Sequence, residues 1–291
     1  MSVSASLVKE LRERTGAGMM ECKKALVETE GDLEAAVDVL RKSGQARADR
    51  KAGRVAADGR VVVSQDGDKV VIVEINSETD FVAKDENFEA FAAAVAAAAL
   101  GSGTTDVVEL AAQPLDDGRT VEEARTALVT KVGENISVRR VAIVDHAGPI
   151  GFYTHGLRIG AVVALEGGDS ELARDIAMHV AAINPACIDE SGVDADTLAR
   201  ERSIYQEQAE ASGKPPEIVE KMVTGRVAKF LKEITLVGQP FVKDSDQTVG
   251  ALLQGASASV ASFVRFEVGE GIAKKVDNFA AEVMAQVNSA G

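Results

Sequence analysis

The chain has 291 residues, of which 46% are hydrophobic and 27% are charged, and its formal net charge at pH 7 is −14. This length is sufficient for two domain-sized cores, whereas the acidic balance argues against sequence-independent binding to a phosphate backbone, which needs clustered Lys and Arg. Aromatic residues make up only 4% and Trp is absent, so platforms for stacking single-stranded nucleic acid are not expected either. We therefore expect no direct nucleic-acid partner.

The cysteines and the apolar runs indicate a protein of the cytoplasm. Cys22 and Cys187 lie far apart without CxxC spacing, which argues against a disulfide framework or a zinc site and fits a reducing compartment. The first residues include four charges between positions 9 and 13 where a signal peptide would need an apolar core. The longest apolar run, residues 90–100, is too short to span a bilayer.

Residues 1–44 predict three short helices. The Gly-Ala-Gly sequence at 16–18 separates the first from the second, and Asp32 is a good N-cap for the third, which we expect to stop at Gly44. Three helices in about 40 residues resemble a ubiquitin-associated bundle, a module that binds partners through small apolar patches. Met19 and Met20 are either such a patch or part of the core.

The segment from residue 41 to residue 54 holds six basic residues and one acidic residue, with two glycines. A charge run of this composition is usually solvated. We interpret it as a linker and a domain boundary that few contacts cross.

From residue 59 the pattern predicts a repeated unit of the α+β class. Alignment of the two closing strands by eye matches Ser137 with Ser262 and Arg140 with Arg265. The first copy is expected to have strands at 59–64, 70–76 and 136–144 with helices at 86–99, 106–112 and 120–132, and the second to have strands at 149–155, 159–166 and 260–268 with a helix at 170–183. A helical hairpin is inserted at 193–234, and a final helix is expected at 278–287.

The segment 76–84 (NSETDFVAK) follows the predicted strand 70–76 and precedes an Ala-rich helix. Thr79 or Asp80 can cap that helix. Phe81 then either packs into the core or is presented to another protein as a wedge. Periodicity does not decide between these two interpretations.

Motifs for bond chemistry are missing from the sequence. There is no phosphate-binding P-loop, no GxGxxG after a strand, no HExxH and no GxSxG. His179 lies on an apolar helix and is expected to be a satisfied core residue, the Asp-Gly-Asp sequence at 66–68 is expected to be a hairpin turn, and His155 is expected in a turn between strands. We expect no catalytic residue, no metal site, no cofactor and no enzyme activity.

Eight stretches, in order along the chain, resemble the bacterial elongation factor Ts family, the guanine-nucleotide exchange factors of elongation factor Tu. The stretches are 7–20 (LVKELRERTGAGMM), 22–26 (CKKAL), 79–84 (TDFVAK), 133–136 (GENI), 155–160 (HGLRIG), 178–182 (MHVAA), 238–242 (GQPFV) and 265–271 (RFEVGEG). The resemblance implies an N-terminal module, a core of two related subdomains, a helical-hairpin dimerisation module and a C-terminal module. The boundaries that follow are 1–54, 55–145, 146–192 with 235–268, 193–234, and 269–291.

The resemblance also implies roles for individual residues. Asp80 and Phe81, with the flanking Thr79 and Val82, would insert between helices of the nucleotide-binding domain of elongation factor Tu and disturb its Mg²⁺ site, so that GDP leaves and GTP replaces it. Arg12, Met19, Met20 and Lys23 in the N-terminal module would touch the same nucleotide-binding domain. His155 in the second subdomain would lie on the partner-facing surface. The partner would be bound with GDP or free of nucleotide, and the hairpin could support a homodimer.

A competing interpretation is an adaptor or scaffold of the ubiquitin-associated type without exchange activity, which residues 1–44 alone would allow. An enzyme is a weaker third interpretation.

Overall fold

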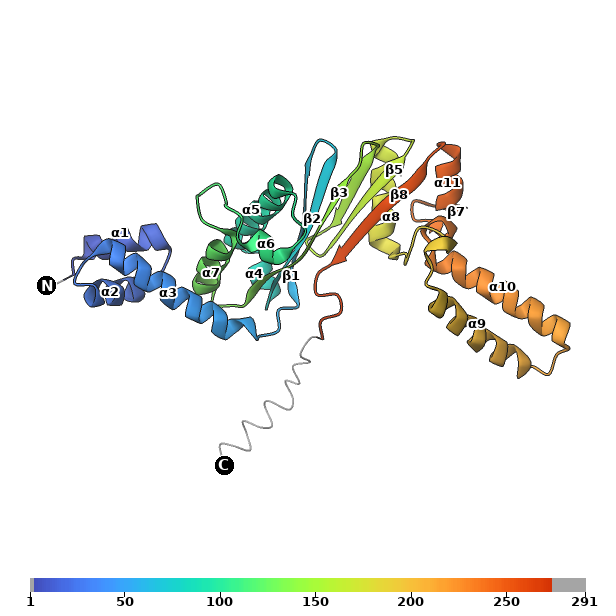
Figure 1. Cartoon of the computed structure of the whole chain (residues 1–291), viewed down its shortest axis with the longest axis horizontal. Helices are drawn as coiled ribbons and strands as arrows, with labels where there is room; N and C mark the ends of the chain where they lie inside the picture. The colour runs from blue at the N-terminus through green and yellow to red at the C-terminus, as the bar shows by residue number, and fades with distance from the viewer. Residues whose placement is uncertain (1–2, 274–291) are drawn as a thin grey trace, which may run out of the picture.

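The computed structural model describes residues 3–273, so the helix expected at 278–287 lies outside the described residues. The molecule is elongated: three helices form one end, two β-sheets lie in the middle, and a helical hairpin projects at the other end (Figure 1). The mixed helix and antiparallel-sheet architecture confirms the predicted α+β class. Within the described residues, no helix is both long enough and apolar enough to cross a membrane.

The N-terminal module consists of α1 (Ala5–Thr15), α2 (Met19–Glu28) and the first half of α3 (Leu33–Ala52). The Ser4 hydroxyl caps α1, Gly16 ends it with φ +68°, and Asp32 caps α3 as predicted. A small core joins the three helices, and its buried members are Val8, Leu11, Ala17, Cys22, Ala25, Leu26 and Ala36. The prediction of a three-helix bundle is confirmed.

Helix α3 does not stop at Gly44, and the prediction of a solvated linker over 41–54 is wrong. Gly44 is buried inside the helix, and a Cβ there would lie 3.2 Å from Thr130 Oγ1. The glycine therefore permits close approach between α3 and α7 (Val121–Val132) rather than ending a helix. Ala48 belongs to the core of the first sheet unit, and Arg41 pairs with Glu123. The charge run is thus one face of a packed helix.

The first sheet unit contains β1 (Asp58–Asp66), β2 (Lys69–Ser77) and β3 (Ile136–Asp145), antiparallel in the order β1-β2-β3. Gly67, at φ +55°, forms the predicted hairpin turn between β1 and β2. Between β2 and β3 the chain forms α4 (Asp80–Ala83), α5 (Glu86–Ser102), α6 (Val107–Ala111) and α7.

The second sheet unit repeats this topology with β4 (Ile150–His155), β5 (Ile159–Glu166) and β8 (Ser259–Glu267), in the order β4-β5-β8. Helix α8 (Ser170–Ile183) follows β5, as α5 follows β2. The predicted repeat and hairpin are therefore confirmed, whereas the short β6–β7 ribbon was not predicted. The inserted elements are η1 (Glu190–Gly192), α9 (Ala195–Glu210), α10 (Pro216–Ile234), η2 (Leu236–Gly238), β6 (Pro240–Phe241), β7 (Asp244–Thr248) and α11 (Val249–Gly255).

The two sheets pack face to face, with helices on their outer faces. Successive residues of β2 point to opposite faces of the sheet. Val71, Val73 and Ile75 pack in the core under α5 and α7. Val70 and Ile72 pack in the core between the sheets. Strand β5 alternates in the same way between α8 and the sheet interface. At Gly160 a Cβ would lie 2.6 Å from Val61 Cγ1, so this glycine is required by the close approach of the sheets.

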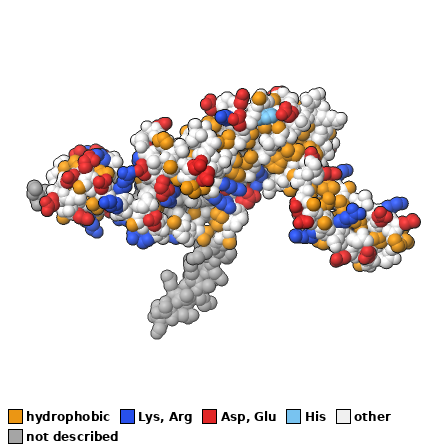
Figure 2. Space-filling model, in the orientation of Figure 1, with side chains coloured by type: hydrophobic (Ala, Val, Ile, Leu, Met, Phe, Trp, Pro, Cys, Tyr) orange, Lys and Arg blue, Asp and Glu red, His pale blue; other side chains and the backbone are white. Residues whose placement is uncertain are grey.

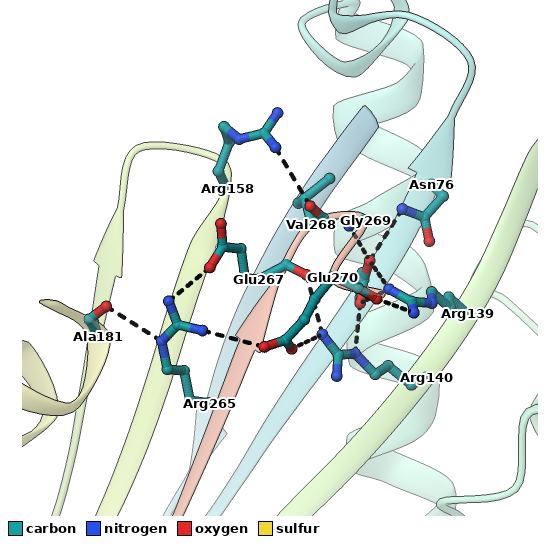
Figure 3. A network of polar contacts seen from close by, with 11 residues as sticks. Asn76, Arg139, Arg140, Arg158, Ala181, Arg265, Glu267, Val268, Gly269 and Glu270 are labelled. Atoms are coloured by element: carbon teal, nitrogen blue, oxygen red, sulfur yellow. Dashed lines mark hydrogen bonds and ion pairs between the residues drawn. The ribbon is translucent and has the colours of Figure 1, made fainter. Parts of the chain in front are cut away.

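A buried carboxylate lies at one end of this sheet interface. The side chain of Glu74 on β2 has no exposed surface, and its two oxygens accept hydrogen bonds from Asn76 (3.0 Å), Arg139 (2.9 Å), Arg140 (2.5 Å) and the Gly269 N–H (2.8 Å) (Figure 3). Burial raises the pKa of Glu74, but the hydrogen bonds from Gly269, Arg139, Asn76 and Arg140 outweigh it, and the net direction is downward. The cluster ties β2 and β3 of the first unit to the segment that leaves β8.

Candidate partner-binding surface

Residues 78–84, called here the Phe81 turn, connect β2 to α5 and contain the single-turn helix α4. Thr79 is its N-cap, with the Thr79 hydroxyl accepting from the Val82 N–H at 3.4 Å. Asp85 caps the following helix by accepting from the Asn87 N–H at 2.8 Å. The prediction that Thr79 or Asp80 caps the Ala-rich helix is therefore wrong: Thr79 caps only the single turn α4, and Asp85 caps the Ala-rich helix α5.

Phe81 projects from this turn into solvent. Its side chain is 81% exposed, whereas the next residue, Val82, packs partly against the core of the first unit and Ala83 is buried. The interpretation that Phe81 packs into the core is therefore wrong. Phe81 is thus an exposed aromatic side chain on a turn whose neighbouring residues are anchored.

Asp80, beside Phe81, forms an ion pair with Lys84 one turn later. The Asp80 Oδ2 to Lys84 Nζ distance is 2.6 Å, and the two side chains are 53% and 63% exposed. Exposed pairs at this spacing contribute little to stability. The Asp80 carboxylate is consequently available to exchange Lys84 for a donor on a partner.

The Phe81 turn is fastened to the loop that precedes β3. The Glu134 carboxylate accepts from both the Thr79 N–H (3.0 Å) and the Thr79 hydroxyl (2.7 Å). In the reverse direction, the Glu78 carboxylate accepts from the Asn135 N–H at 2.6 Å and pairs with Arg54 at 2.8 Å. Two glutamates, one from each segment, thus hold the turn against the loop.

The N-terminal module presents an apolar patch on α2. Met19, Met20 and Val27 are 52%, 64% and 59% exposed, so neither methionine is a core residue. Lys23 is exposed on the same helix, and Arg12 is exposed on α1. The spacing of Met20, Lys23 and Val27 places them along one face of α2.

The histidines differ in their surroundings. His155, at the end of β4, is exposed, and its Nδ1 lies 3.3 Å from the Tyr153 hydroxyl. His179 is buried: its Nδ1 accepts from the Val242 N–H at 3.1 Å, which leaves Nε2 to donate to Gln239 Oε1 at 2.9 Å. Burial lowers the pKa of His179 and keeps it neutral, with the Gln239 bond acting in the opposite direction. The prediction of a satisfied core histidine is confirmed.

The predicted site residues fall into three separate groups. Thr79–Val82 lie together on the Phe81 turn, the α1–α2 residues lie on the N-terminal module, and His155 lies on the second unit. Among residues 3–273, no group of three His, Cys, Asp or Glu side chains is placed to hold a metal ion. Sequence reasoning missed Val27, Glu78 and Glu134. Glu134 lies in the GENI stretch 133–136, but its hydrogen bond with Thr79, 55 positions away, leaves no signal in a single sequence.

Comparison with known proteins gives one family. The model of the family "Elongation factor TS" matches residues 78–270. The chain belongs to the elongation factor Ts family. An elongation factor Ts of Thioalkalivibrio sulfidiphilus is 62% identical over the whole of both chains, one of Methylococcus capsulatus is 60% identical over 99% of this chain and 100% of its own, and one of Legionella pneumophila is 55% identical over 99% of each. In this chain, the region matched by the family model begins at Glu78, which opens the Phe81 turn, and ends at Glu270, whose carboxylate pairs with Arg140 of the Glu74 cluster.

Proposed function

We propose that this chain binds elongation factor Tu and accelerates release of its GDP, acting by binding and not by bond chemistry. The observation that carries the proposal is Phe81, 81% exposed on a turn that is capped by Thr79 and clamped by Glu134. A side chain held in this way can enter a gap between helices of a partner. We place Asp80 and Phe81 at the nucleotide-binding domain, near the helix that positions a ligand of Mg²⁺.

The physical basis is the strict coordination of the metal. A P-loop GTPase holds GDP through backbone donors to the phosphates and through a Mg²⁺ ion that requires near-octahedral geometry. Moving a helix that positions one ligand should therefore weaken GDP binding strongly. An exchange factor needs only to bind the nucleotide-free conformation better than the GDP-bound one, because linkage makes the effect reciprocal.

Phe81 cannot supply the whole effect. Shifting a two-state population from 1:99 to 99:1 takes about 5.5 kcal/mol of differential binding, and burying one phenylalanine contributes about 1.5–3 kcal/mol. Further contact areas are required, and we assign these to Met19, Met20, Lys23 and Arg12 on the N-terminal module and to His155 on the second unit. The packed sheet interface supports this assignment because it fixes the two units relative to each other.

The hairpin α9–α10 is our candidate for a homodimer contact. Hydrophobic side chains gather on the face of the hairpin seen in Figure 2, and Ile204 and Ile218 are 39% and 45% exposed. Exposed apolar residues on a projecting element are a common feature of protein interfaces. Sedimentation of the full chain over a range of concentrations tests this part of the proposal.

The central experiment measures release of fluorescent GDP from elongation factor Tu after mixing with excess unlabelled GDP, with and without this chain. We expect the chain to accelerate release by orders of magnitude at substoichiometric concentration. Release at the spontaneous rate, with a complex still formed, would favour the adaptor interpretation instead.

A further inference from the structure

The Phe81 turn holds a helix that is too short to be stable alone. Helix α4 has only four residues, and nucleating one helical turn in isolation is unfavourable. Phe81, at its second position, is exposed and contributes nothing to its packing. Other groups must therefore fix the direction in which Phe81 points.

The usual local solution is absent from this helix. In a capping box, the third helical residue is Glu or Gln and its side chain reaches back to the N–H of the N-cap. Here the third residue is Val82, which has no acceptor and packs on the core instead. The N–H of Thr79 consequently needs an acceptor from elsewhere.

Glu134 supplies it. One oxygen of its carboxylate accepts the Thr79 N–H at 3.0 Å and the other accepts the Thr79 hydroxyl at 2.7 Å. This second bond orients the hydroxyl so that its lone pair faces the Val82 N–H. Charge-assisted hydrogen bonds of this kind are stronger than neutral ones. The half-buried carboxylate thus completes the cap from a distance of 55 residues along the chain.

The loop that carries Glu134 also receives the end of α3. Lys51 donates to the Gly133 carbonyl, and the Asn135 amide donates to the carbonyls of Ala52 (3.3 Å) and Arg54 (2.8 Å). The loop is therefore held on a second side by the helix that begins in the N-terminal module. It provides a fixed base for the Phe81 turn.

We propose that Glu134 is a positioning residue for exchange: it touches neither nucleotide nor partner, and it acts by holding the Phe81 turn in the orientation that inserts Phe81. This inference rests on the proposed function of Phe81. It predicts that Glu134 matters for the rate within the complex and much less for the affinity, because the large contact areas lie on other elements.

The test is a double-mutant cycle on the full chain, with GDP release from elongation factor Tu followed at increasing concentrations of each variant. Glu134→Ala should lower the maximal rate about tenfold and change the half-saturating concentration less than about twofold. Glu134→Gln, which keeps one acceptor oxygen, should fall between it and the wild type. On a Phe81→Ala background, Glu134→Ala should have no further effect, since a residue that acts only through Phe81 loses its role with it.

Glu109→Ala is the matched control. It removes a hydroxyl–carboxylate hydrogen bond of similar length, 2.8 Å from the Thr104 hydroxyl, at an exposed site on α6, and should leave both parameters unchanged. A thermal unfolding curve for each variant shows whether a slower rate comes from a misplaced Phe81 turn or from an unfolded protein.

The possible failures are distinguishable. If Phe81→Ala exchanges at the wild-type maximal rate, the proposed role of Phe81 is wrong and the inference falls with it. If Phe81→Ala is slow but both Glu134 variants are as fast as the wild type, only the inference is overturned. It is equally overturned if Glu134→Ala slows exchange by the same factor with or without Phe81, which would indicate a general structural role.

Discussion

The two sheet units differ in the segment that joins their second strand to the long helix behind it, α5 in the first unit and α8 in the second. In the first unit, β2 is followed by residues 78–85, which include α4 and the exposed Phe81, before α5 begins at Glu86. In the second unit, β5 is followed only by Gly167, Gly168 and Asp169 before α8 begins. Both helices are capped by an aspartate, Asp85 in one and Asp169 in the other.

This difference shows which connecting residues the fold requires and which are additional. A sheet unit of this topology closes with a three-residue connection, in which the two glycines adopt φ +74° and +71°. The additional residues of the first unit are therefore not required to join strand to helix. Their most exposed member is Phe81, and they are held by Glu134, so the added segment is built to present a side chain.

The units also differ in the ion pairing at their closing strands. Arg140 on β3 lies opposite Glu74, whereas Arg265 on β8 lies opposite Ala161 and pairs with Glu267 at 2.7 Å. Of the two units, only the first has a fully buried carboxylate opposite the arginine of its closing strand. The largest effect on stability is therefore expected there.

Glu74→Ala should lower the free energy of unfolding by about 3 kcal/mol, because it leaves two guanidinium groups without their buried partner. We expect the lower end of the usual range since Arg139 and Arg140 keep 27% and 30% of their side-chain surface exposed. Denaturant unfolding measures the change. Asp145→Ala is the control: its ion pair with Lys69 also joins β3 to β2, but the two side chains are 59% and 53% exposed, so its loss should cost less than about 1 kcal/mol. Equal losses for the two variants would contradict the assigned role of Glu74.

Two truncations should locate the boundary between the N-terminal module and the first unit. Deletion of residues 1–40 removes the α2 patch and should raise the half-saturating concentration for exchange about tenfold, mainly through faster dissociation. Deletion of residues 1–50 also removes Ala48 from the core and the Gln45–Thr126 hydrogen bond. The longer deletion should therefore lower Tm by about a further 5 °C. Identical melting curves would show that the second half of α3 is not part of the folded unit.

The acid sensitivity of the Glu74 cluster follows from the direction of its pKa. The folded-state pKa is lowered, so below about pH 4.3, the usual glutamate value, the unfolded chain binds more protons than the folded one. The stabilisation is complete above this pH and is lost as the pH falls through the folded-state pKa. The difference in unfolding free energy between wild type and Glu74→Gln should shrink across that interval. A constant difference down to pH 3 would contradict the lowered pKa.

The smallest effect is expected for a single member of the α2 patch. Met20→Ala should raise the half-saturating concentration for exchange by about fivefold or less and leave the maximal rate unchanged, since truncating one exposed apolar contact removes about 1 kcal/mol or less. Ile218→Ala, on the hairpin, is the control and should change neither parameter. A lower maximal rate for Met20→Ala would show that the patch acts on the nucleotide and not only on affinity.

The sequence predicted those parts of the molecule that depend on local patterns. The strands β2 and β5, the Asp32 cap and the Gly67 turn are readable because neighbouring residues determine them. The course of α3 was not predicted, because Gly44 normally disfavours a helix interior, and only its packing against Thr126 and Thr130 reveals why it is tolerated there. The exposure of Phe81 and the hydrogen bonds from Thr79 to Glu134 depend on contacts between segments that are distant in the chain. Such contacts cannot be recognised in a single sequence.

The most direct test of the central claim compares Phe81→Ala with Val108→Ala at saturating concentration of each variant. Val108, on α6 of the same unit, is a hydrophobic side chain that is 77% exposed, close to the 81% of Phe81. We predict that Phe81→Ala lowers the maximal rate of GDP release from elongation factor Tu by about ten- to a hundredfold, as expected for about 1.5–3 kcal/mol of lost burial, while Val108→Ala matches the wild type. Wild-type release by Phe81→Ala, or an equal loss in both variants, would contradict the claim.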